Sequence, residues 1–206
     1  MDIPVLRSPR IDGRRLRSER TRQVLIESYL ELVRENLQVP TAAQIAQRAG
    51  CSVRSVFERF SDMLSLSLAA VDYAFARGMA QEVVRNLDAD RQTRLQSQVE
   101  TRAEICERWL PLWRALVRNR SESEHLAVRI ERARNMIVDR LEMMYRPELS
   151  TVPERQRRQI LIALETLTDF ESWGRMRDHH GLSVEAARDV WINAIDRMLP
   201  PTPTCI

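Results

Sequence analysis

The chain has 206 residues, of which 30% are charged and only 5% are aromatic, and it has five glycines. This length can bury a core without disulfides or metals, and the scarcity of strand-forming runs favours long amphipathic helices over sandwiches and barrels. The net charge is +3, all 32 basic residues are arginine, and the excess positive charge lies in the first 60 residues, where a polyanion can be met.

The cysteines and histidines give no indication of a catalytic or metal site. Cys51, Cys106 and Cys205 lie far apart and lack metal-ligand spacing, so we expect reduced thiols. The adjacent His179 and His180 would point in different directions on a helix. No catalytic constellation, phosphate-binding glycine loop or membrane-length apolar run is present. We therefore expect a cytoplasmic protein, near the nucleoid, with no enzymatic activity, metal, cofactor or membrane partner.

Residues 1–13 predict a mobile arm, because they contain two prolines and a glycine and show no hydrophobic period. From about Leu16 to Asn36, apolar residues recur at spacings of three and four, which predicts an amphipathic helix. Asn36 suits a left-handed helix end, and Pro40 prevents continuation of the helix.

The next stretch, TAAQIAQRAGCSVRSVFERF, contains the starts of two short helices. Thr41 and Gln44 have the spacing of a capping box, in which each side chain satisfies a backbone donor of the other residue. Gly50 stands where the first of these helices must end and turn. Ser52 can cap a second one that runs to about Phe60. This order predicts a helix–turn–helix unit.

The second short helix is suited to a DNA groove. In helix–turn–helix proteins this helix lies in the major groove, and its early side chains meet base edges. Arginine can bond two guanine acceptors, serine can donate or accept, and valine can pack against a thymine methyl. Hydroxyls and amides at helix N-termini suit phosphates. The predicted contacts with double-stranded DNA are Thr41, Ser52, Val53, Arg54, Ser55, Phe57 and Arg59.

The same residues resemble the N-terminal DNA-binding domain of TetR-family transcriptional regulators. The resemblance covers roughly residues 20–66 and rests on Thr41, Ile45-Ala46, Ala49-Gly50-Cys51-Ser52, Phe57, Phe60 and Leu66. It implies a three-helix DNA-binding domain, a recognition helix and a divergent C-terminal domain that binds an effector and a second copy. Beyond this stretch, the chain resembles the family only in length, helical pattern and two closing helices.

Four positions depart from the family pattern. Phe57 replaces the usual Tyr and Met63 the usual Lys, so two phosphate contacts are absent and nonspecific DNA affinity should be weaker. Arg54 stands where a small residue is usual, and Asn36 replaces Gly. An Arg-rich arm that includes Arg15 and Arg17 can compensate at the DNA backbone or minor groove, or form a solvated charge run.

The remaining pattern predicts helices near residues 62–87, 91–119, 122–146, 153–180 and 184–199, with Pro111 kinking or splitting the second of them. Bulky, adaptable side chains in this part suit a broad apolar cavity for a small apolar or amphipathic effector, although ordinary core packing gives the same pattern. The residues predicted to bind the effector are Trp109, Trp113, Met136, Arg140, Met144 and Trp173.

The last two predicted helices are apolar on more than one side. The segment ILIALETL within residues 153–180 is apolar nearly all round, which a single small domain cannot easily cover. A two-fold homodimer would bury both faces, and a deeply embedded core hairpin is the alternative. The predicted dimer residues are Leu161, Leu164, Thr168, Val190, Trp191 and Ile195.

The sequence thus predicts an all-α protein with an arm (1–13), a helix–turn–helix domain (14–61) and a helical effector-binding and dimerisation domain (62–206). The function expected is that of a ligand-responsive homodimeric repressor at a palindromic operator. The alternative is a DNA-binding protein that organises the chromosome without an effector. A helical adaptor without nucleic acid would show no salt-sensitive binding to duplex DNA.

Overall fold

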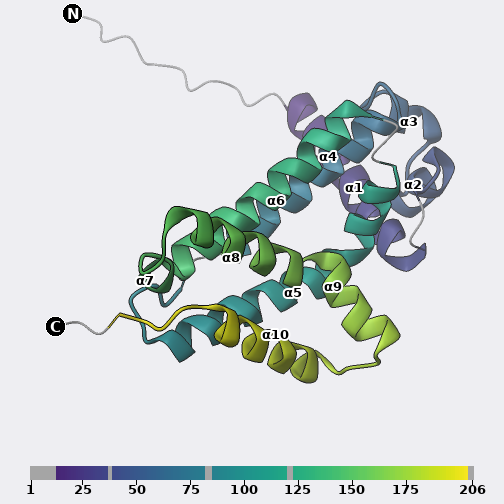
Figure 1. Ribbon diagram of the computed structural model, residues 1–206. Coiled ribbons are helices and arrows are strands. Elements are labelled where there is room, and N and C mark those ends of the chain that lie inside the picture. Colours follow the sequence, from purple (N-terminus) through teal and green to yellow (C-terminus); the bar gives the residue numbers. More distant parts are fainter. Residues whose placement is uncertain (1–12, 37–38, 82–84, 120–122, 204–206) are drawn as a thin grey trace, which may run out of the picture. The chain divides into compact units, whose positions relative to one another are not determined.

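The structure is a computed structural model that describes residues 13–36, 39–81, 85–119 and 123–203 (Figure 1). Every regular element in these ranges is a helix, which confirms the predicted all-α class. The chain divides into an N-terminal unit, Met1–Ala70, and a C-terminal unit, Val71–Ile206. The predicted arm lies outside the described residues, except for Gly13, which begins the first helix.

The N-terminal unit is built from α1 (Gly13–Asn36), α2 (Ala42–Ala49), α3 (Val53–Phe57) and the start of α4 (Met63–Gln81). Helix α2 packs against α1 and α3. Fully or almost fully buried side chains from all four helices form the core, among them Leu25, Tyr29, Ile45, Val56 and Leu66. The Tyr29 hydroxyl lies 3.0 Å from the Ser67 hydroxyl, and this buried bond ties α1 to α4.

The boundaries of these helices differ modestly from the predicted ones. Helix α1 begins three residues before Leu16 and ends at Asn36 as predicted. Helix α3 ends at Phe57, because the chain turns at the next residues instead of continuing to Phe60. Phe60 still reaches the core and is 4% exposed. The α3 segment is therefore short, and both its ends are fixed by the turns that flank it.

The C-terminal unit centres on one long helix, α5, which contacts α6, α9 and α10. Pro111 lies inside α5 and does not split it. Helices α6 and α10 agree with their predicted positions to within about two residues. The elements after α4 are α5 (Arg91–Arg118), α6 (Glu124–Met144), α7 (Arg146–Leu149), α8 (Glu154–Leu167), α9 (Phe170–Gly174), the π-helix η2 (Arg175–His179) and α10 (Val184–Met198).

The predicted single helix over residues 153–180 is wrong. Helix α8 ends at Leu167, and α9 begins at Phe170 with Asp169 as its N-cap, whose carboxylate accepts from the Ser172 amide at 2.5 Å. The local cause is visible in the sequence, because Asp is a strong N-cap residue and here interrupts an apolar helical run. After the break, α9 packs on α5, and Arg177 and Asp178 of η2 pair with Glu107 and Arg114 of α5.

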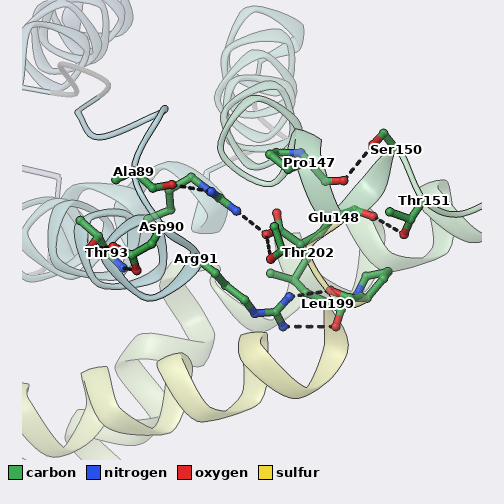
Figure 2. A network of polar contacts seen from close by, with 12 residues as sticks. Ala89, Asp90, Arg91, Thr93, Pro147, Glu148, Ser150, Thr151, Leu199 and Thr202 are labelled. Atoms are coloured by element: carbon green, nitrogen blue, oxygen red, sulfur yellow. Dashed lines mark hydrogen bonds and ion pairs between the residues drawn. The ribbon is translucent and has the colours of Figure 1, made fainter. Parts of the chain in front are cut away.

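Arg91 and Glu148 hold the C-terminal segment against α5 and α7 (Figure 2). Arg94 forms an ion pair with Glu148, and both side chains are almost completely buried. The Thr202 hydroxyl donates to the same Glu148 carboxylate at 2.5 Å. Arg91 donates to the Pro200 carbonyl at 2.5 Å and pairs with Asp196 at 2.8 Å. The chain beyond α10 is thus bonded to the first turn of α5 through Arg91 and to α7 through Glu148.

Candidate nucleic-acid interface and ligand cavity

The turn between α2 and α3 is fixed by caps at every helix end. The Thr41 hydroxyl accepts from the Gln44 amide at 3.3 Å, and the Gln44 side chain accepts from the Thr41 amide at 2.8 Å, which confirms the predicted capping box. Gly50 has a φ of 66°, a left-handed conformation that favours glycine, and ends α2 as predicted. The Ser52 hydroxyl then accepts from the Ser55 amide at 3.2 Å and starts α3.

Helix α3 turns one side into the core and the other outward. Val56 is 1% exposed, whereas Val53 and Phe57 are 42% and 48% exposed. The Arg54 side chain is 88% exposed and its Nε lies 3.1 Å from a Glu58 carboxylate oxygen. Two large apolar side chains and a guanidinium thus stand outside on a five-residue helix. Such a surface is compatible with thymine methyls and guanine acceptors.

Arg59 lies in a partly buried cluster beside α3. One Arg59 nitrogen lies 3.7 Å from Glu58, and the Arg59 carbonyl accepts from Arg22 at 3.5 Å. The Arg22 guanidinium lies 4.3 Å from the centre of the Phe60 ring, as in a cation–π contact. Glu58 therefore neutralises part of the charge that Arg54 and Arg59 bring to this surface.

The other predicted DNA contacts have local partners. The Thr41 hydroxyl donates to Gln44 at 2.9 Å, and the Ser52 and Ser55 hydroxyls lie 2.9 Å apart. Arg17 is exposed and its Nε donates to the Gly13 carbonyl at 3.1 Å. The side chain of the remaining predicted contact, Arg15, lies outside the described residues.

Arg48, in the same unit, forms ion pairs within the protein. It bonds Glu35 at 2.6 Å and Glu31 at 3.3 Å, and so fastens α2 to α1. The hydrogen bond from Arg48 lowers the pKa of the Glu35 carboxyl below its usual value. Because two carboxylates already surround Arg48, it is a poor candidate for phosphate binding.

An apolar cavity of about 60 Å³ lies within the C-terminal unit. Three of the predicted effector residues, Trp109, Trp113 and Met136, line it. The Trp113 ring stacks on Phe170 with 4.9 Å between ring centres. The full lining consists of Ala74, Phe75, Arg102, Ile105, Trp109, Leu112, Trp113, Leu116, Ala133, Met136, Ile137 and Phe170.

The structure does not bring the other three predicted effector residues to this cavity. Arg140 is buried and its Nε donates to the Gln98 side chain at 2.6 Å. Trp173 packs on Trp191 with 4.7 Å between ring centres, and Met144 is fully buried. Core packing and buried bonding thus account for these positions.

The charged residue that does line the cavity is Arg102, which the sequence reasoning missed. It is 4% exposed, although it belongs to a residue type expected at the surface. Its position on α5 is one turn past Val99 and next to Ala103, both buried. The sequence could have indicated its burial, because Arg102 falls on the same apolar side of the helix as these two residues.

Most side chains predicted to form the dimer lie inside the C-terminal unit. Leu161, Leu164, Thr168, Trp191 and Ile195 are all buried. The sixth, Val190, is 44% exposed on α10, and its counterpart on α8 is Ile162, at 57%. These five side chains have little surface to offer a second copy, so we expect an interface on these helices to use mainly their outward residues.

The described residues contain neither a metal-ligand group nor a membrane-spanning helix. They contain no group of three His, Cys, Asp or Glu side chains placed to hold a metal ion. Among the same residues, no helix has both the length and the apolar character of a membrane span.

Comparison with known proteins identifies the fold. No family model and no curated protein matches the sequence. A TetR-family transcriptional regulator from Streptomyces coelicolor matches the structure with a TM-score of 0.74 at 18% identity, over 87% of this chain and 80% of that one. The chain has the TetR-family fold.

Two further structures share the TetR-family fold with this chain. The multidrug-binding protein EbrR, solved with imidazole, matches with a TM-score of 0.59 at 15% identity, over 97% of this chain and all of that one. NalD of Pseudomonas aeruginosa, the secondary repressor of the MexAB-OprM multidrug efflux pump, matches with a TM-score of 0.52 at 20% identity, over 89% and 98%. Helix α3 of this chain thus belongs to a helix–turn–helix domain, and the cavity to the helical domain that follows it.

Proposed function

We propose that the chain is a cytoplasmic, homodimeric transcriptional repressor that binds a palindromic operator and responds to a small effector. The observation that carries the proposal is the capped α2–turn–α3 unit, whose last helix turns Val53, Arg54 and Phe57 outward. The excess positive charge in the first 60 residues supports contact with a polyanion. The TetR-family fold supports a regulatory role, since its members with known structure include repressors such as NalD.

In the proposed complex, α3 lies in the major groove. Arg54 bonds guanine, Val53 packs against a thymine methyl, and Ser55 contributes a hydroxyl beside them. Arg54 can leave Glu58 for a base edge because an exposed pair of this kind contributes only about 0.3–0.5 kcal/mol. Phosphate contacts come from Arg17, Arg59 and the capped helix starts at Thr41 and Ser52.

The proposed dimer forms through the outer faces of α8 and α10. These two helices contact each other, so Ile162 and Val190 lie on neighbouring helices with their side chains outward. Such a pair of helices meets its symmetry mate in a self-complementary interface. Two α3 helices would then read two half-sites, one helical turn or more apart.

The cavity supports a ligand-gated version of this function over chromosome organisation without an effector. It is apolar and aromatic, and residues of α4, α5, α6 and α9 of one unit line it. In one conformation of the dimer, the distance between the two α3 helices does not match the operator. A ligand that binds this conformation better lowers operator affinity, typically by a coupling free energy of about 1–3 kcal/mol. EbrR shows that a protein with this fold can hold a small molecule.

Selection of bound fragments from random duplex DNA tests the proposal. We expect the purified chain to enrich a palindrome, with binding that weakens steeply as salt rises. Enrichment of many unrelated sequences would favour the chromosome-organising alternative. Failure to retain any duplex at low ionic strength would exclude both versions.

A further inference from the structure

The cavity holds a buried guanidinium whose bonding is incomplete. Arg102 lines the cavity and is 4% exposed. Its Nε donates to the Thr168 carbonyl at 2.8 Å, and its guanidinium carbon lies 4.6 Å from the centre of the Phe170 ring. Its Nη2 is buried without a hydrogen-bond partner. A permanently charged group has thus been placed at an apolar wall with donors left unused.

The surroundings do not supply the missing acceptor. Among the described residues, no carboxylate lies within ion-pair distance of Arg102. Burial raises the pKa of the Glu165 carboxyl above its usual value, and the charges of Arg134 and Arg102 oppose this rise. An uncompensated buried charge is strongly unfavourable. A ligand with an acceptor for Nη2 would relieve this cost and should therefore bind tightly.

The rest of the lining defines the body of the ligand. Phe75, Trp109, Trp113 and Phe170 offer ring faces and edges, and Met136 is unbranched and adaptable. The cavity of about 60 Å³ is smaller than the roughly 150 Å³ that admits one benzene ring elsewhere. To admit one ring, the cavity must widen by about the volume of one side chain. Met136 and Phe75 line the cavity and are half-buried, so their side chains can move to make this room.

We propose that the effector is a small aromatic monocarboxylate, whose ring enters this cavity and whose carboxylate accepts from Arg102. A monoanion fits better than a phosphate, because Thr168 already occupies Nε and the remaining lining of the cavity is apolar. Charge-assisted bonds from arginine to carboxylate are short and strong. This inference deepens the proposed function, on which its regulatory meaning rests, but the binding itself does not require DNA.

The same arginine links the ligand to the proposed dimer face. Thr168 is the residue at the C-terminal end of α8, and its carbonyl is held by Arg102. A carboxylate that engages Nη2 therefore acts on a group already bonded to the end of α8. If Arg102 moves toward the ligand, its bond to Thr168 would shift the junction between α8 and α9.

Tryptophan fluorescence of the full chain measures binding directly, because two of its four tryptophans line the cavity. The probes are benzoate and phenylacetate, with benzamide and phenylacetamide as neutral matches and benzylamine as the cation, checked by calorimetry. We expect each acid to bind at least tenfold more tightly than its amide, and benzylamine to bind weakest. Equal binding of acids and amides would overturn the proposal, as would binding of none of the acids.

Variants assign the effect to one arginine. Arg102→Gln should remove at least tenfold of the affinity for the acids and leave that for the amides nearly unchanged. Arg108→Gln is the matched control, since Arg108 lies on the same helix 5.2 Å from the Trp109 ring without lining the cavity. Should Arg102→Gln fail to fold, Arg102→Lys keeps the charge and should retain preference for acids. Equal loss for acids and amides in Arg102→Gln would contradict the proposal.

Operator binding is measured separately on the same preparations. A chain that distinguishes acids from amides but binds no DNA would overturn the proposed function and leave this inference standing. A chain that binds a palindrome but shows no preference for the acids would overturn this inference alone.

Discussion

The two units of the chain are specified by different kinds of interaction. In the N-terminal unit, the turn before α3 and the start of α3 are fixed by bonds between residues three apart, Thr41 with Gln44 and Ser52 with Ser55. In the C-terminal unit, arginines of α5 bond partners far along the chain, as Arg94 does with Glu148 (Figure 2). Local caps thus fix the short helix α3, whereas distant polar bonds connect the helices of the larger C-terminal unit.

The largest expected effect tests the distant bonds. Glu148→Ala leaves the Arg94 guanidinium buried without its carboxylate, so the C-terminal unit should lose about 3–5 kcal/mol of unfolding free energy. All four tryptophans lie in this unit, so urea unfolding followed by tryptophan fluorescence reports on it alone. Glu154→Ala, which removes an exposed pair with Arg157, is the control and should cost at most about 1 kcal/mol.

A double variant sharpens this test. Arg94→Leu combined with Glu148→Leu removes both charges together, and should be less destabilised than Glu148→Ala. If the double variant loses as much as Arg94→Leu and Glu148→Leu do in sum, the two residues do not act as a pair, and the assignment of the loss to an uncompensated charge is wrong.

The next effect concerns the proposed DNA-contacting side of α3. Arg54→Ala should weaken binding to the selected operator by about 1–3 kcal/mol, because a bidentate arginine–guanine contact is lost. Fluorescence anisotropy with a labelled duplex measures it. Arg48→Ala removes the same charge from a side chain already held by Glu31 and Glu35, and should change operator affinity little. Equal loss on random DNA would make Arg54 a phosphate contact.

The outer face of the C-terminal unit gives a comparable effect. Val190→Arg places a charge at the centre of the proposed dimer face and should raise the dimer dissociation constant at least tenfold, about 1.4 kcal/mol. Sedimentation velocity over a concentration series measures the change. Val128→Arg is the matched control, because Val128 is a similarly exposed valine on α6. A Val190→Arg chain that stays dimeric would place the interface elsewhere.

The smallest effect returns to the local turns. Gly50→Ala places a side chain at φ 66° with open space around it, so only backbone strain of about 1 kcal/mol is added. The N-terminal unit contains no tryptophan, so circular dichroism should show the loss while the tryptophan transition stays in place. A shift of both transitions together would show that the two units unfold as one.

The difference between the units also explains what the sequence could predict. Thr41, Gly50 and Ser52 end or begin helices through bonds and backbone angles within a few residues. Their pattern in the sequence is therefore enough to predict the helix–turn–helix. The break at Asp169 was missed because the apolar run before it favoured one long helix, although Asp itself is a capping residue.

The buried arginines were beyond this kind of reasoning. Periodicity places hydrophobic residues inward and treats arginine as solvent-facing, so Arg102 was not expected at the cavity. Arg140 was expected to meet a ligand, but its partner is Gln98, 42 residues away in the chain. Pairs this far apart in the chain can be identified only from the three-dimensional structure.

Sedimentation of the full chain with a short duplex at low ionic strength tests the central claim most directly. The account predicts a dimer in the absence of DNA, and two chains on each duplex that carries the selected palindrome. A chain that sediments as a monomer and leaves every duplex unbound would contradict it.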